Sequence, residues 1–582
     1  MIRRLWSHLS TRRQRQFLLM QMLIIVGSFL EMLSLGAVLP FLTALSEPEY
    51  LFEFEYLQIF SNAHNIRDAQ NFVLPFTVIF VALILFSAIF RGLILWAMTR
   101  LSFTAGADLS VSMYQQTLHQ DYEIHVSRNS SEVINGIITK TKTVTSGVIY
   151  PMLNLISSLV TIIGIMVVLL GVNVVITLVA FLGFGGLYML VMIATRGVLN
   201  RNSHLIAEKS DLMVKSLQEG LGGVRDVLIN NTQEFYTQLY KNSDLAMRRA
   251  SWRNEIVASI PKFGMEAIGI TAIALFAYAS TRTLQGLDQV LPTLGVFVLG
   301  AQKLLPLFQK AYASYSRIKA SKYSLLDVLV LLDQPRLIDN NPSKISALSF
   351  RESIELSGLS FRYADNSPWV LKDLDLTIPK GTVLGIVGIT GCGKSTLVDI
   401  LMGLLMPTCG EMRVDGELIT HENRKPWQQL ISSVPQNIYL TDSTLEENIA
   451  FGCASTEIDH ERVKLAAQLA QISAVIEAWS DGYDTVVGER GLRISGGQRQ
   501  RVGIARAFYR QSEIIFLDEA TSALDDHTEK AVMSAIRSLD KETTIIIIAH
   551  RITTLKNCDQ ILRLGENNHA EVITYKELLG SV

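Results

Sequence analysis

The N-terminal half of the chain contains six long apolar runs separated by polar segments. They lie at approximately 17–45, 72–97, 144–170, 174–196, 256–281 and 290–312. A helix needs about 20 mainly apolar residues to cross the hydrocarbon core of a bilayer. The pattern therefore predicts six transmembrane helices, with a lipid bilayer as the surroundings of this half of the chain.

The polar segments between these runs alternate in charge. The N-terminal segment and the connections 98–143 and 197–254 are rich in arginine and lysine, whereas 46–71 is rich in glutamate. Because cytoplasmic loops carry the excess of cations, both termini are predicted to lie in the cytoplasm. The outer connection 46–71 would form either a short amphipathic helix at the membrane surface or an ordinary solvated loop.

The two cation-rich connections also show helical periodicity. One example is "LMVKSLQEGLGGVRDVLINNTQEFYTQLY", in which apolar residues recur every three to four positions. We therefore expect helical hairpins that carry the spans beyond the bilayer, with short turns near residues 121–130 and 222–232.

The composition supports a membrane protein and gives no sign of a nucleic-acid partner. Charged residues make up 18% of the chain and hydrophobic residues 49%, whereas soluble proteins carry about 25% charged residues. The net charge is -2, and nucleic-acid binding usually shows as a basic domain or stripe. The four cysteines form no CxxC pair, so the sequence predicts neither a zinc site nor a disulfide framework.

The pattern changes after the last apolar run, from long apolar segments to short strand-like ones. We place a transmembrane domain at residues 1–330, a linker at 331–349 and a second domain at 350–582. Alternating short strands and helices in the second domain predict an α/β fold.

The second domain contains a glycine-rich turn between a predicted strand and a predicted helix. The stretch "LGIVGITGCGKST" begins with an apolar strand at 384–387 and matches the pattern GxxxxGK[ST]. Glycines let backbone N–H groups curl around phosphate oxygens, and the start of the helix adds partial positive charge. In this pattern the lysine reaches the β- and γ-phosphates and the serine hydroxyl ligates Mg²⁺. The predicted ATP-binding residues are Gly388, Gly391, Gly393, Lys394, Ser395 and Thr396.

A second strand, "EIIFLDEA" at 513–520, is apolar until it ends in two carboxylates. Asp518 is placed where a carboxylate holds Mg²⁺, and Glu519 where one polarises the attacking water. An acidic surface turn would be the structural alternative, but the phosphate loop in the same domain favours the nucleotide site.

Three further stretches complete a family pattern. "ISGGQRQR" (494–501), "IIFLDEATSALD" (514–525) and "IIIIAHR" (545–551) together resemble the ATPase domain of ABC transporters, across nearly all of 350–582. Ile494 stands where the family usually has leucine, which is a small apolar change. The resemblance implies an α-helical six-span transmembrane domain followed by an α/β P-loop NTPase domain, with ATP and Mg²⁺ as cofactors.

The resemblance also implies roles for individual residues. Tyr363 would stack on adenine, Gln436 would contact Mg²⁺ and the water, and His550 would sense the γ-phosphate. Asp525 would belong to a loop between subunits. The signature residues that would bind the γ-phosphate are Ser495, Gly496, Gly497 and Gln498.

The chain carries one phosphate loop and one signature stretch. In the family the signature of one subunit completes the ATP site of the other, so the resemblance implies a dimer. A homodimer is the simplest closed arrangement, with a heterodimer as the alternative. Six spans with long cytoplasmic hairpins resemble the exporter class, which implies a multi-pass protein of the inner (plasma) membrane with its ATPase domain in the cytoplasm.

Three cations lie inside predicted spans, namely Arg91, Lys262 and Lys303. Each costs about 2.5–3.5 kcal/mol at mid-bilayer on insertion scales, so such residues usually face a cavity or a partner. They would either line a cavity that receives an anionic group such as a pyrophosphate, or pair with Glu31 or Glu266 and snorkel to the interface.

The membrane half also carries a resemblance of its own. "SFLEMLSLGAVLPFL" in the first span and "KLLP" in the sixth look like the PglK-type group of ABC exporters, the bacterial lipid-linked oligosaccharide flippases. This implies a polyprenyl-pyrophosphate glycan as the cargo, moved from the inner to the outer leaflet. The alternatives are an exporter of drugs, peptides or simple lipids, and an ATP-gated channel or sensor.

Overall fold

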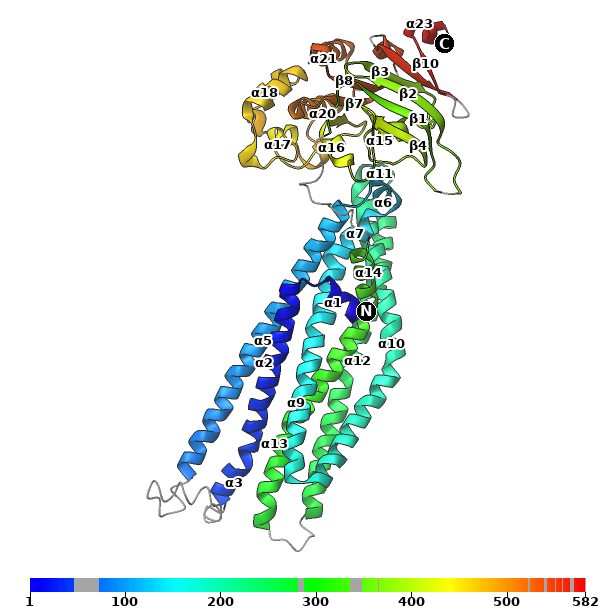
Figure 1. Cartoon of the computed structure of the whole chain (residues 1–582). Coiled ribbons are helices and arrows are strands. Elements are labelled where there is room, and N and C mark those ends of the chain that lie inside the picture. Colours follow the sequence, from blue (N-terminus) through cyan, green and yellow to red (C-terminus); the bar gives the residue numbers. More distant parts are fainter. Residues whose placement is uncertain are drawn as a thin grey trace. The chain divides into compact units, whose positions relative to one another are not determined.

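The structure is a computed structural model that describes residues 1–46, 73–280, 287–334, 348–364, 366–521, 524–538, 542–549, 551–556, 558–565 and 570–580. Residue contacts divide the chain into two compact units. One comprises Met1–Gln120 and Ser127–Arg336, and the other comprises Asp121–Val126 and Leu337–Val582. Figure 1 shows the long helices of the first unit and the strands of the second.

Long helices make up the first unit. Its main helices are α1 (Ile2–His8), α2 (Thr11–Gly36), α3 (Val38–Ser46), α5 (Val73–Leu118), α7 (Ser130–Asn135), α8 (Thr141–Val144), α9 (Tyr150–Val172), α10 (Val174–Gly222), α11 (Val224–Ile229), α12 (Gln233–Ser280), α13 (Leu287–Ala320) and α14 (Lys322–Leu332). Two π-helical segments, η3 (Gly136–Lys140) and η4 (Thr145–Ile149), flank α8. Such segments insert an extra residue into a helical turn.

Four helical stretches in the described part are long and apolar enough to cross a membrane: Thr11–Leu45, Val73–Leu118, Ser130–Val172 and Thr177–Gly222. They coincide with the first four predicted spans. The other two predicted spans fall on the helices α12 and α13. Neither helix is among these four stretches, so these two spans stay predictions. The connection predicted as an outer helix or loop falls mainly on 47–72, which also lie outside the described residues.

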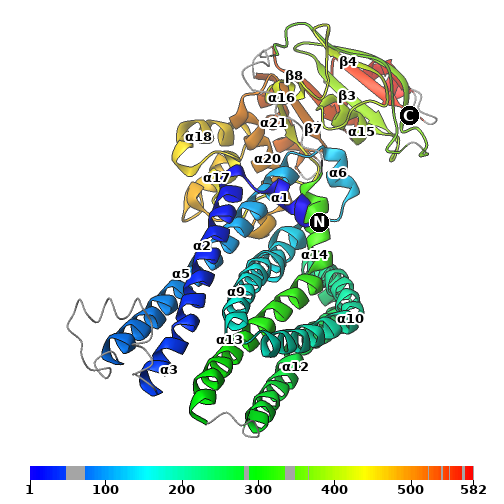
Figure 2. The same cartoon turned by 60° about the horizontal axis from the view of Figure 1, so that its bottom comes forward.

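The predicted hairpin turns are confirmed. The first turn contains the short helix α6 (Tyr122–Ser127), and the second contains α11 between Gly223 and Asn230. Residues 121–126 of the first turn belong to the second compact unit. Helix α9 packs against both α2 and α13, and Figure 2 shows it beside α13.

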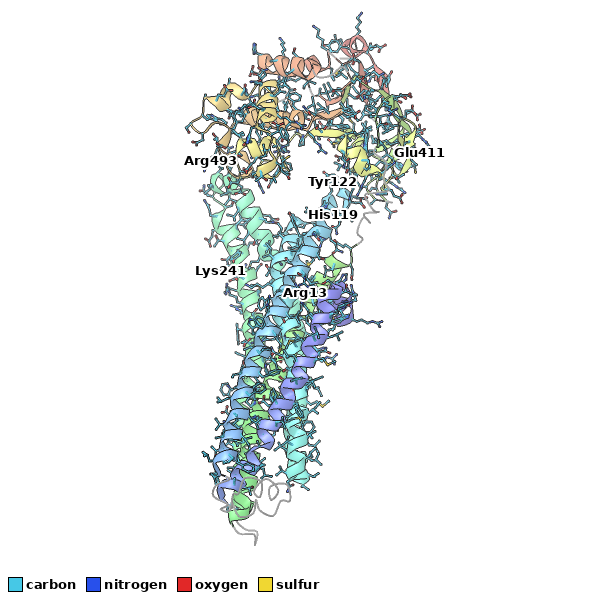
Figure 3. All side chains as sticks on the ribbon, turned by 60° about the vertical axis from the view of Figure 1, so that its left-hand side comes forward. Arg13, His119, Tyr122, Lys241, Glu411 and Arg493 are labelled. Atoms are coloured by element: carbon cyan, nitrogen blue, oxygen red, sulfur yellow. The ribbon has the colours of Figure 1, made fainter. Side chains whose placement is uncertain are left out.

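The basic N-terminus is anchored to a neighbouring helix. Helix α2 begins where the Ser10 hydroxyl accepts the N–H of Arg13 at 3.3 Å. The guanidinium of Arg13, labelled in Figure 3, pairs with Asp108 of α5, with Nε and Oδ2 2.7 Å apart. This ion pair joins the first two long helices, α2 and α5, outside their apolar stretches.

The second unit contains two sheets. The smaller sheet is antiparallel with the order β2-β1-β4-β5, and the larger has the order β10-β9-β3-β8-β7-β6, with β10 as its antiparallel edge. The strands are β1 (Ser353–Phe361), β2 (Leu371–Pro379), β3 (Val383–Gly388), β4 (Cys409–Val414), β5 (Glu417–Leu418), β6 (Ile431–Val434), β7 (Ile514–Asp518), β8 (Thr544–Ile548), β9 (Gln560–Leu564) and β10 (Ala570–Ile573). Strand β8 is buried along its whole length, as expected for a central parallel strand covered on both faces.

Helices surround the larger sheet. They include α15 (Lys394–Leu401), α16 (Arg424–Gln429), α17 (Leu445–Ile449), α18 (His460–Leu469), α19 (Ser473–Glu477), α20 (Gly496–Arg510), α21 (Asp526–Ser538), α22 (Ile552–Leu555) and α23 (Tyr575–Gly580). The predicted α/β fold is confirmed, with the phosphate loop at the end of β3 and the carboxylates at the end of β7. The predicted domain bounds stay a prediction, because much of the linker (335–347) lies outside the described residues.

Strand register places the predicted site residues at one edge. In the parallel ladder Ile386 of β3 and Asp518 of β7 both pair with Ile548 of β8. The carboxyl ends of these strands therefore meet at the same edge of the sheet. In open α/β sheets this edge is where ligands bind.

Candidate nucleotide-binding site and membrane cavity

The phosphate loop closes around the side chain of Lys394. The residue is buried, and its ammonium donates to the carbonyl oxygens of Gly388 at 2.8 Å and Ile389 at 2.9 Å. Gly393 adopts φ 96°, a left-handed conformation that favours glycine, and it caps α15. A Cβ at Gly388 would overlap the carbonyl oxygen of Leu564. The backbone thus holds the ammonium at the mouth of the loop, where it can reach a phosphate.

Gly391, Ser395 and Thr396 complete this loop. Gly391 has φ 86° and Ser395 is exposed in the first turn of α15. Thr396 is buried, and its hydroxyl lies 3.1 Å from that of Tyr363. The Tyr363 ring is 45% exposed and meets Phe361 edge to face, with the ring centroids 5.0 Å apart. An exposed aromatic ring beside the loop can stack on a purine base.

The end of β7 brings two more predicted residues together. Glu519 follows the strand with φ 49°, a left-handed conformation that is uncommon for a residue with a side chain. Its Oε2 accepts a hydrogen bond from Nε2 of Gln436 at 2.8 Å, and its carbonyl oxygen accepts one from Nε2 of Gln500 at 3.3 Å. The structure therefore places the side chains of Gln436 and Glu519 next to each other, although the two residues are far apart in the sequence.

The residues predicted to hold Mg²⁺ offer oxygen ligands. Ser395 supplies a hydroxyl, Gln436 an amide oxygen and Asp518 a carboxylate, which is the ligand chemistry that Mg²⁺ prefers. Burial, and then the charge of Asp518, raises the pKa of Asp399 on α15 to about 6. Asp399 and Ser395 lie on the same helix, so the charge of Asp518 acts on the helix that carries Ser395. The side chains of Ser395, Gln436 and Asp518 therefore fit Mg²⁺. When bound, the ion would neutralise charge on the β- and γ-phosphates.

The signature stretch forms the start of helix α20. Ser495 is its N-cap: the hydroxyl accepts the N–H of Gln498 at 3.2 Å, and the Gln498 side chain accepts the N–H of Ser495 at 2.8 Å. Gly496 and Gly497 form the first turn, so their backbone N–H groups have no partner within the helix. The N-terminus of this helix is suited to an anion such as a terminal phosphate.

Two further predicted residues, Asp525 and His550, belong to the segments that follow strands β7 and β8. Asp525 is exposed, and hydrogen bonds from the Thr528 side chain and backbone lower the pKa of its carboxyl group, which caps α21. His550 lies outside the described residues, so its predicted role is not placed.

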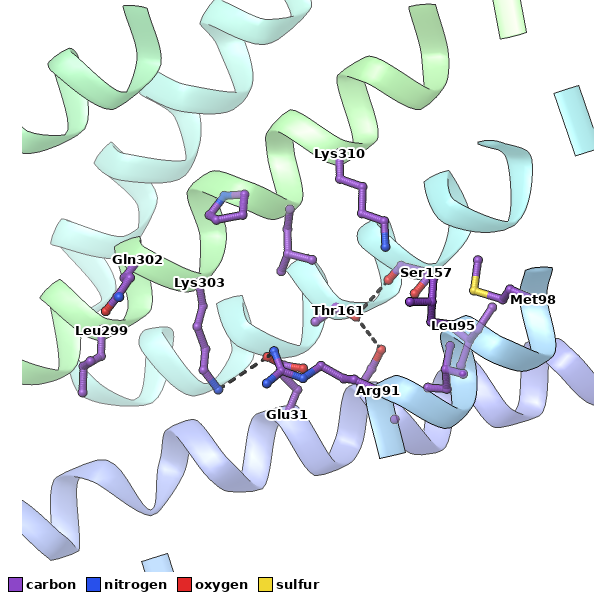
Figure 4. Close-up of a pocket in the computed structure, with 16 residues that line it drawn as sticks. Glu31, Arg91, Leu95, Met98, Ser157, Thr161, Leu299, Gln302, Lys303 and Lys310 are labelled. Carbon is purple, nitrogen blue, oxygen red and sulfur yellow. Dashed lines mark hydrogen bonds and ion pairs between the residues drawn. The ribbon is translucent and has the colours of Figure 1, made fainter. Parts of the chain in front are cut away.

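The first unit contains a charged cavity between its helices. The cavity has a volume of about 480 Å³, is lined from α2, α5, α9 and α13, and is drawn in Figure 4. Glu31 is buried beside it. Its Oε1 lies 3.3 Å from Nη1 of Arg91 and 3.5 Å from Nζ of Lys303, and Lys303 also donates to the Ser34 hydroxyl at 2.8 Å.

Both sequence interpretations of these cations hold in part. Arg91 and Lys303 line the cavity and also pair with Glu31. Lys262 is exposed on α12 and is not among the described residues that line this cavity, so the structure brings together two of the three predicted cations.

Sequence reasoning missed Lys310, which lines the same cavity. It follows Lys303 by seven residues, so the two lysines share one face of α13 two turns apart. That spacing was the available signal. Among the described lining residues, three cations face one carboxylate, and the remaining polar wall includes Gln302, Ser157 and the hydroxyl pair of Ser28 and Thr161 at 2.9 Å.

Comparison with known proteins matches each of the two units to a protein family. The family described as the ABC transporter transmembrane region matches residues 17–299, and the family described as ABC transporter matches 371–522. This chain is an ABC exporter half-transporter. It is an ATP-binding, multi-pass membrane protein whose ATPase is coupled to translocation, and the exporter fold implies that it works as a dimer.

Individual relatives support this assignment. An "ATP-dependent lipid A-core flippase" of Alkalilimnicola ehrlichii is 29% identical over 68% of this chain and 67% of the relative. A protein of the same name from Burkholderia pseudomallei is 28% identical over 81% and 78%. The "Heterocyst differentiation ATP-binding protein HepA" of a Nostoc species is 28% identical over 98% and 94%. The names of these relatives do not mention lipid-linked oligosaccharides.

A solved structure shows the same fold. A bacterial Atm1-family ABC exporter with ATP bound superposes with a TM-score of 0.79 over 98% of this chain and 96% of that chain, at 23% sequence identity. The helical unit and the α/β unit therefore occur together in one known exporter architecture.

Proposed function

We propose that this half-transporter forms a homodimer that flips a lipid-linked oligosaccharide, a polyprenyl-pyrophosphate glycan, from the inner to the outer leaflet of the inner membrane. The observation that carries the proposal is the cavity in which Arg91, Lys303 and Lys310 face the single carboxylate of Glu31 among the described lining residues. The alternative is export of drugs, peptides or simple lipids on the same scaffold.

The charge balance of the cavity favours an anionic group. Three cations against one carboxylate leave an excess of positive charge between apolar helices, where burying unpaired charge is costly. Arginine suits this role because its planar guanidinium can hold two phosphate oxygens at once. Glu31 would keep Arg91 and Lys303 in place while the site is empty, and an anionic group would then compete for them.

The nucleotide-binding unit would supply the driving force. Lys394 would hold the β- and γ-phosphates, and Ser495 with Gly496 and Gly497 would bind the γ-phosphate of ATP held by the partner subunit. Glu519 would orient and polarise the attacking water, with Gln436 beside it. Mg²⁺, if held by Ser395, Gln436 and Asp518, would supply charge neutralisation. His550 would contact the γ-phosphate, as the family resemblance implies.

The proposal is tested by charge reversal in nanodiscs and proteoliposomes. Arg91→Glu and Lys303→Glu should each reduce glycan-lipid flipping and glycan-stimulated ATPase activity about tenfold or more, because each removes a charge-assisted contact worth about 1.5–3 kcal/mol. Lys241→Glu is the matched control, because Lys241 is exposed on α12 outside the predicted spans. Its flipping rate should match that of the unmodified protein.

Two results would contradict the proposal. One is flipping that is unaffected by both cavity reversals. The other is ATPase activity that amphipathic drugs stimulate and candidate glycan lipids do not, which would favour the alternative cargo.

A further inference from the structure

A buried carboxylate lies in the nucleotide-binding unit outside the residues assigned so far. Glu529 sits in the second turn of α21 and is 8% exposed. A carboxylate with so little contact with water needs hydrogen-bond donors from the protein. Three side-chain donors to Glu529 lie among the described residues, and each of them comes from outside its own helix.

The three donors come from two catalytic loops. Oε1 of Glu529 accepts hydrogen bonds from the hydroxyls of Thr521 at 3.1 Å and Thr554 at 2.8 Å. Its Oε2 lies 3.3 Å from Nη1 of Arg551. Thr521 belongs to the loop after β7, and Arg551 and Thr554 belong to the segment after β8. One carboxylate thus joins helix α21 to both loops.

Both loops lead directly to the groups proposed for hydrolysis. Thr521 is two residues beyond Glu519, whose N–H donates to the carbonyl oxygen of Ile548 at 3.2 Å. Arg551 follows position 550, the residue predicted to contact the γ-phosphate. A shift of either loop would therefore move a group next to the terminal phosphate.

A small cavity links these contacts to Glu519. It has a volume of about 30 Å³ and is lined by Glu519 and by all three donors, Thr521, Arg551 and Thr554. A cavity of this size has room for about one water molecule. The residues that Glu529 holds therefore form the wall beside the proposed catalytic carboxylate.

We infer that Glu529 is a positioning residue for ATP hydrolysis. It fixes the loop after β7 relative to the segment that begins at Arg551, so that Glu519 keeps its place at the terminal phosphate. Helix α21 begins directly after the exposed Asp525, which caps it, so the same helix connects the loop assigned to the subunit boundary with this carboxylate. The inference rests on the proposed role of Glu519.

The test is Glu529→Gln in the full-length dimer in nanodiscs. The amide keeps the size of the side chain and can keep an oxygen on the threonine hydroxyls, but it loses the charge that pairs with Arg551 and turns an NH2 donor toward that guanidinium. We expect kcat for ATP to fall about tenfold, with KM for ATP changed less than twofold and the melting temperature nearly unchanged. Glu571→Gln is the matched control. Glu571 is an exposed carboxylate that pairs with Arg563 at 2.7 Å in the same unit, and its loss should leave kcat unchanged.

A double mutant distinguishes positioning from general damage. If Glu529 acts through Glu519, Glu529→Gln should cause no further loss of turnover in a Glu519→Gln background. Thr554→Val keeps the side-chain volume and removes one donor. It should lower kcat about threefold and serves as the second variant if Glu529→Gln folds poorly.

The outcomes separate this inference from the proposed function. Full turnover in Glu519→Gln would overturn the proposed role of Glu519 itself. Loss of turnover in Glu519→Gln with unchanged kcat in both Glu529→Gln and Thr554→Val would overturn only the positioning role. A fall in kcat that is accompanied by an equal rise in KM and a lower melting temperature would also overturn it, since a purely structural residue behaves in that way.

Discussion

The nucleotide-binding unit and the membrane cavity satisfy their charged groups in different ways. In the first, Lys394 is held by two carbonyl oxygens of its own loop, and Glu519 is paired with Gln436. In the second, Arg91 and Lys303 share one carboxylate, and Lys310 lines the same space. The ammonium of Lys394 is held by backbone that lies close in sequence, whereas the charges of the cavity are held by side chains that meet only when distant helices pack.

The difference shows what each site is built to accept. The phosphate loop takes the same chemical group in every cycle, so its geometry can be fixed by backbone and short local contacts. The cavity has an excess of positive charge and polar groups on one wall, so its contacts are completed by a cargo. Each unit also contains a charged residue that departs from this contrast, Lys140 in the membrane unit and Asp399 in the nucleotide-binding unit, and substitutions at these residues test it.

The largest effect is expected for Glu519→Gln, which should nearly abolish ATP turnover but leave the binding of ATP and of the cargo intact. The amide keeps the contact with Gln436 but cannot polarise water as a carboxylate does, so ATPase activity should fall about 100-fold or more. Binding of ATP and of an anionic lipid to the cavity should remain, because no group that contacts either one is lost. ATPase assays and binding of a fluorescent nucleotide measure the two properties. Retention of a tenth or more of the turnover would show that another group activates the water.

Lys140 is an exception within the membrane unit, because its charge is fully matched. Its side chain is 6% exposed, and its ammonium lies 2.7 Å from Asp211 of α10 and 2.6 Å from Asp327 of α14. The amide of Asn135 also donates to Asp211 at 2.8 Å. This cluster joins three helices, and unlike the cavity it has no positive charge left for a ligand.

Lys140→Met should therefore destabilise the protein more than Arg91→Met does. Removing one partner of a buried cluster leaves unpaired carboxylates, with an expected loss of about 2–3 kcal/mol, since both aspartates are partly exposed. Arg91 is more than half exposed, so its loss should cost less than about 1 kcal/mol. Melting temperatures in nanodiscs compare the two variants. If Lys140→Met and Arg91→Met lowered the melting temperature equally, the Lys140 cluster could not be called structural in contrast to the cavity around Arg91.

These cases show how far the sequence alone reaches. The phosphate loop, the strand that ends in Asp518 and the N-cap at Ser495 depend on residues within a few positions of one another, and a local pattern is enough to place them. Arg91 and Lys303 could be singled out because charge inside an apolar run is costly wherever it points. Whether they would face a cavity or pair with Glu31 depended on packing, and the structure shows both.

Other residues carried no local signal beyond the seven-residue spacing of Lys303 and Lys310. Lys310 lies near the end of its apolar run, where a lysine can reach the membrane surface without cost. Lys140 and its aspartates come from three segments separated by 71 and 187 positions. The π-helical segments η3, which contains Lys140, and η4 were likewise not predicted, because no periodicity in the sequence reveals them. Asp399 is a single carboxylate in the middle of an ordinary helix.

Asp399 is the corresponding exception within the nucleotide-binding unit, because its nearest charge has the same sign. Burial and the charge of Asp518 raise the pKa of the Asp399 carboxyl group from 3.8 to about 6. A folded-state pKa above the unfolded value means that the protonated form is favoured in the folded protein. That stabilisation is complete below about pH 4 and is lost as the pH rises through about 6. At pH 8 the ionised carboxylate is therefore a cost to the fold.

Asp399→Asn should remove this cost and produce the smallest effect of the set. We expect the nucleotide-free variant to be more stable than the unmodified protein by about 1–2 kcal/mol at pH 8, a value reduced for partial exposure, and by about half as much at pH 5. Asp415→Asn is the control of opposite sign: burial opposes the shift, but backbone N–H groups of Glu352, Ser353 and Arg351 lower the pKa of Asp415. Its loss should destabilise the protein, and more at pH 8 than at low pH. A stability difference for Asp399→Asn that stays constant from pH 5 to pH 8 would show that the pKa of Asp399 is not raised in the folded protein.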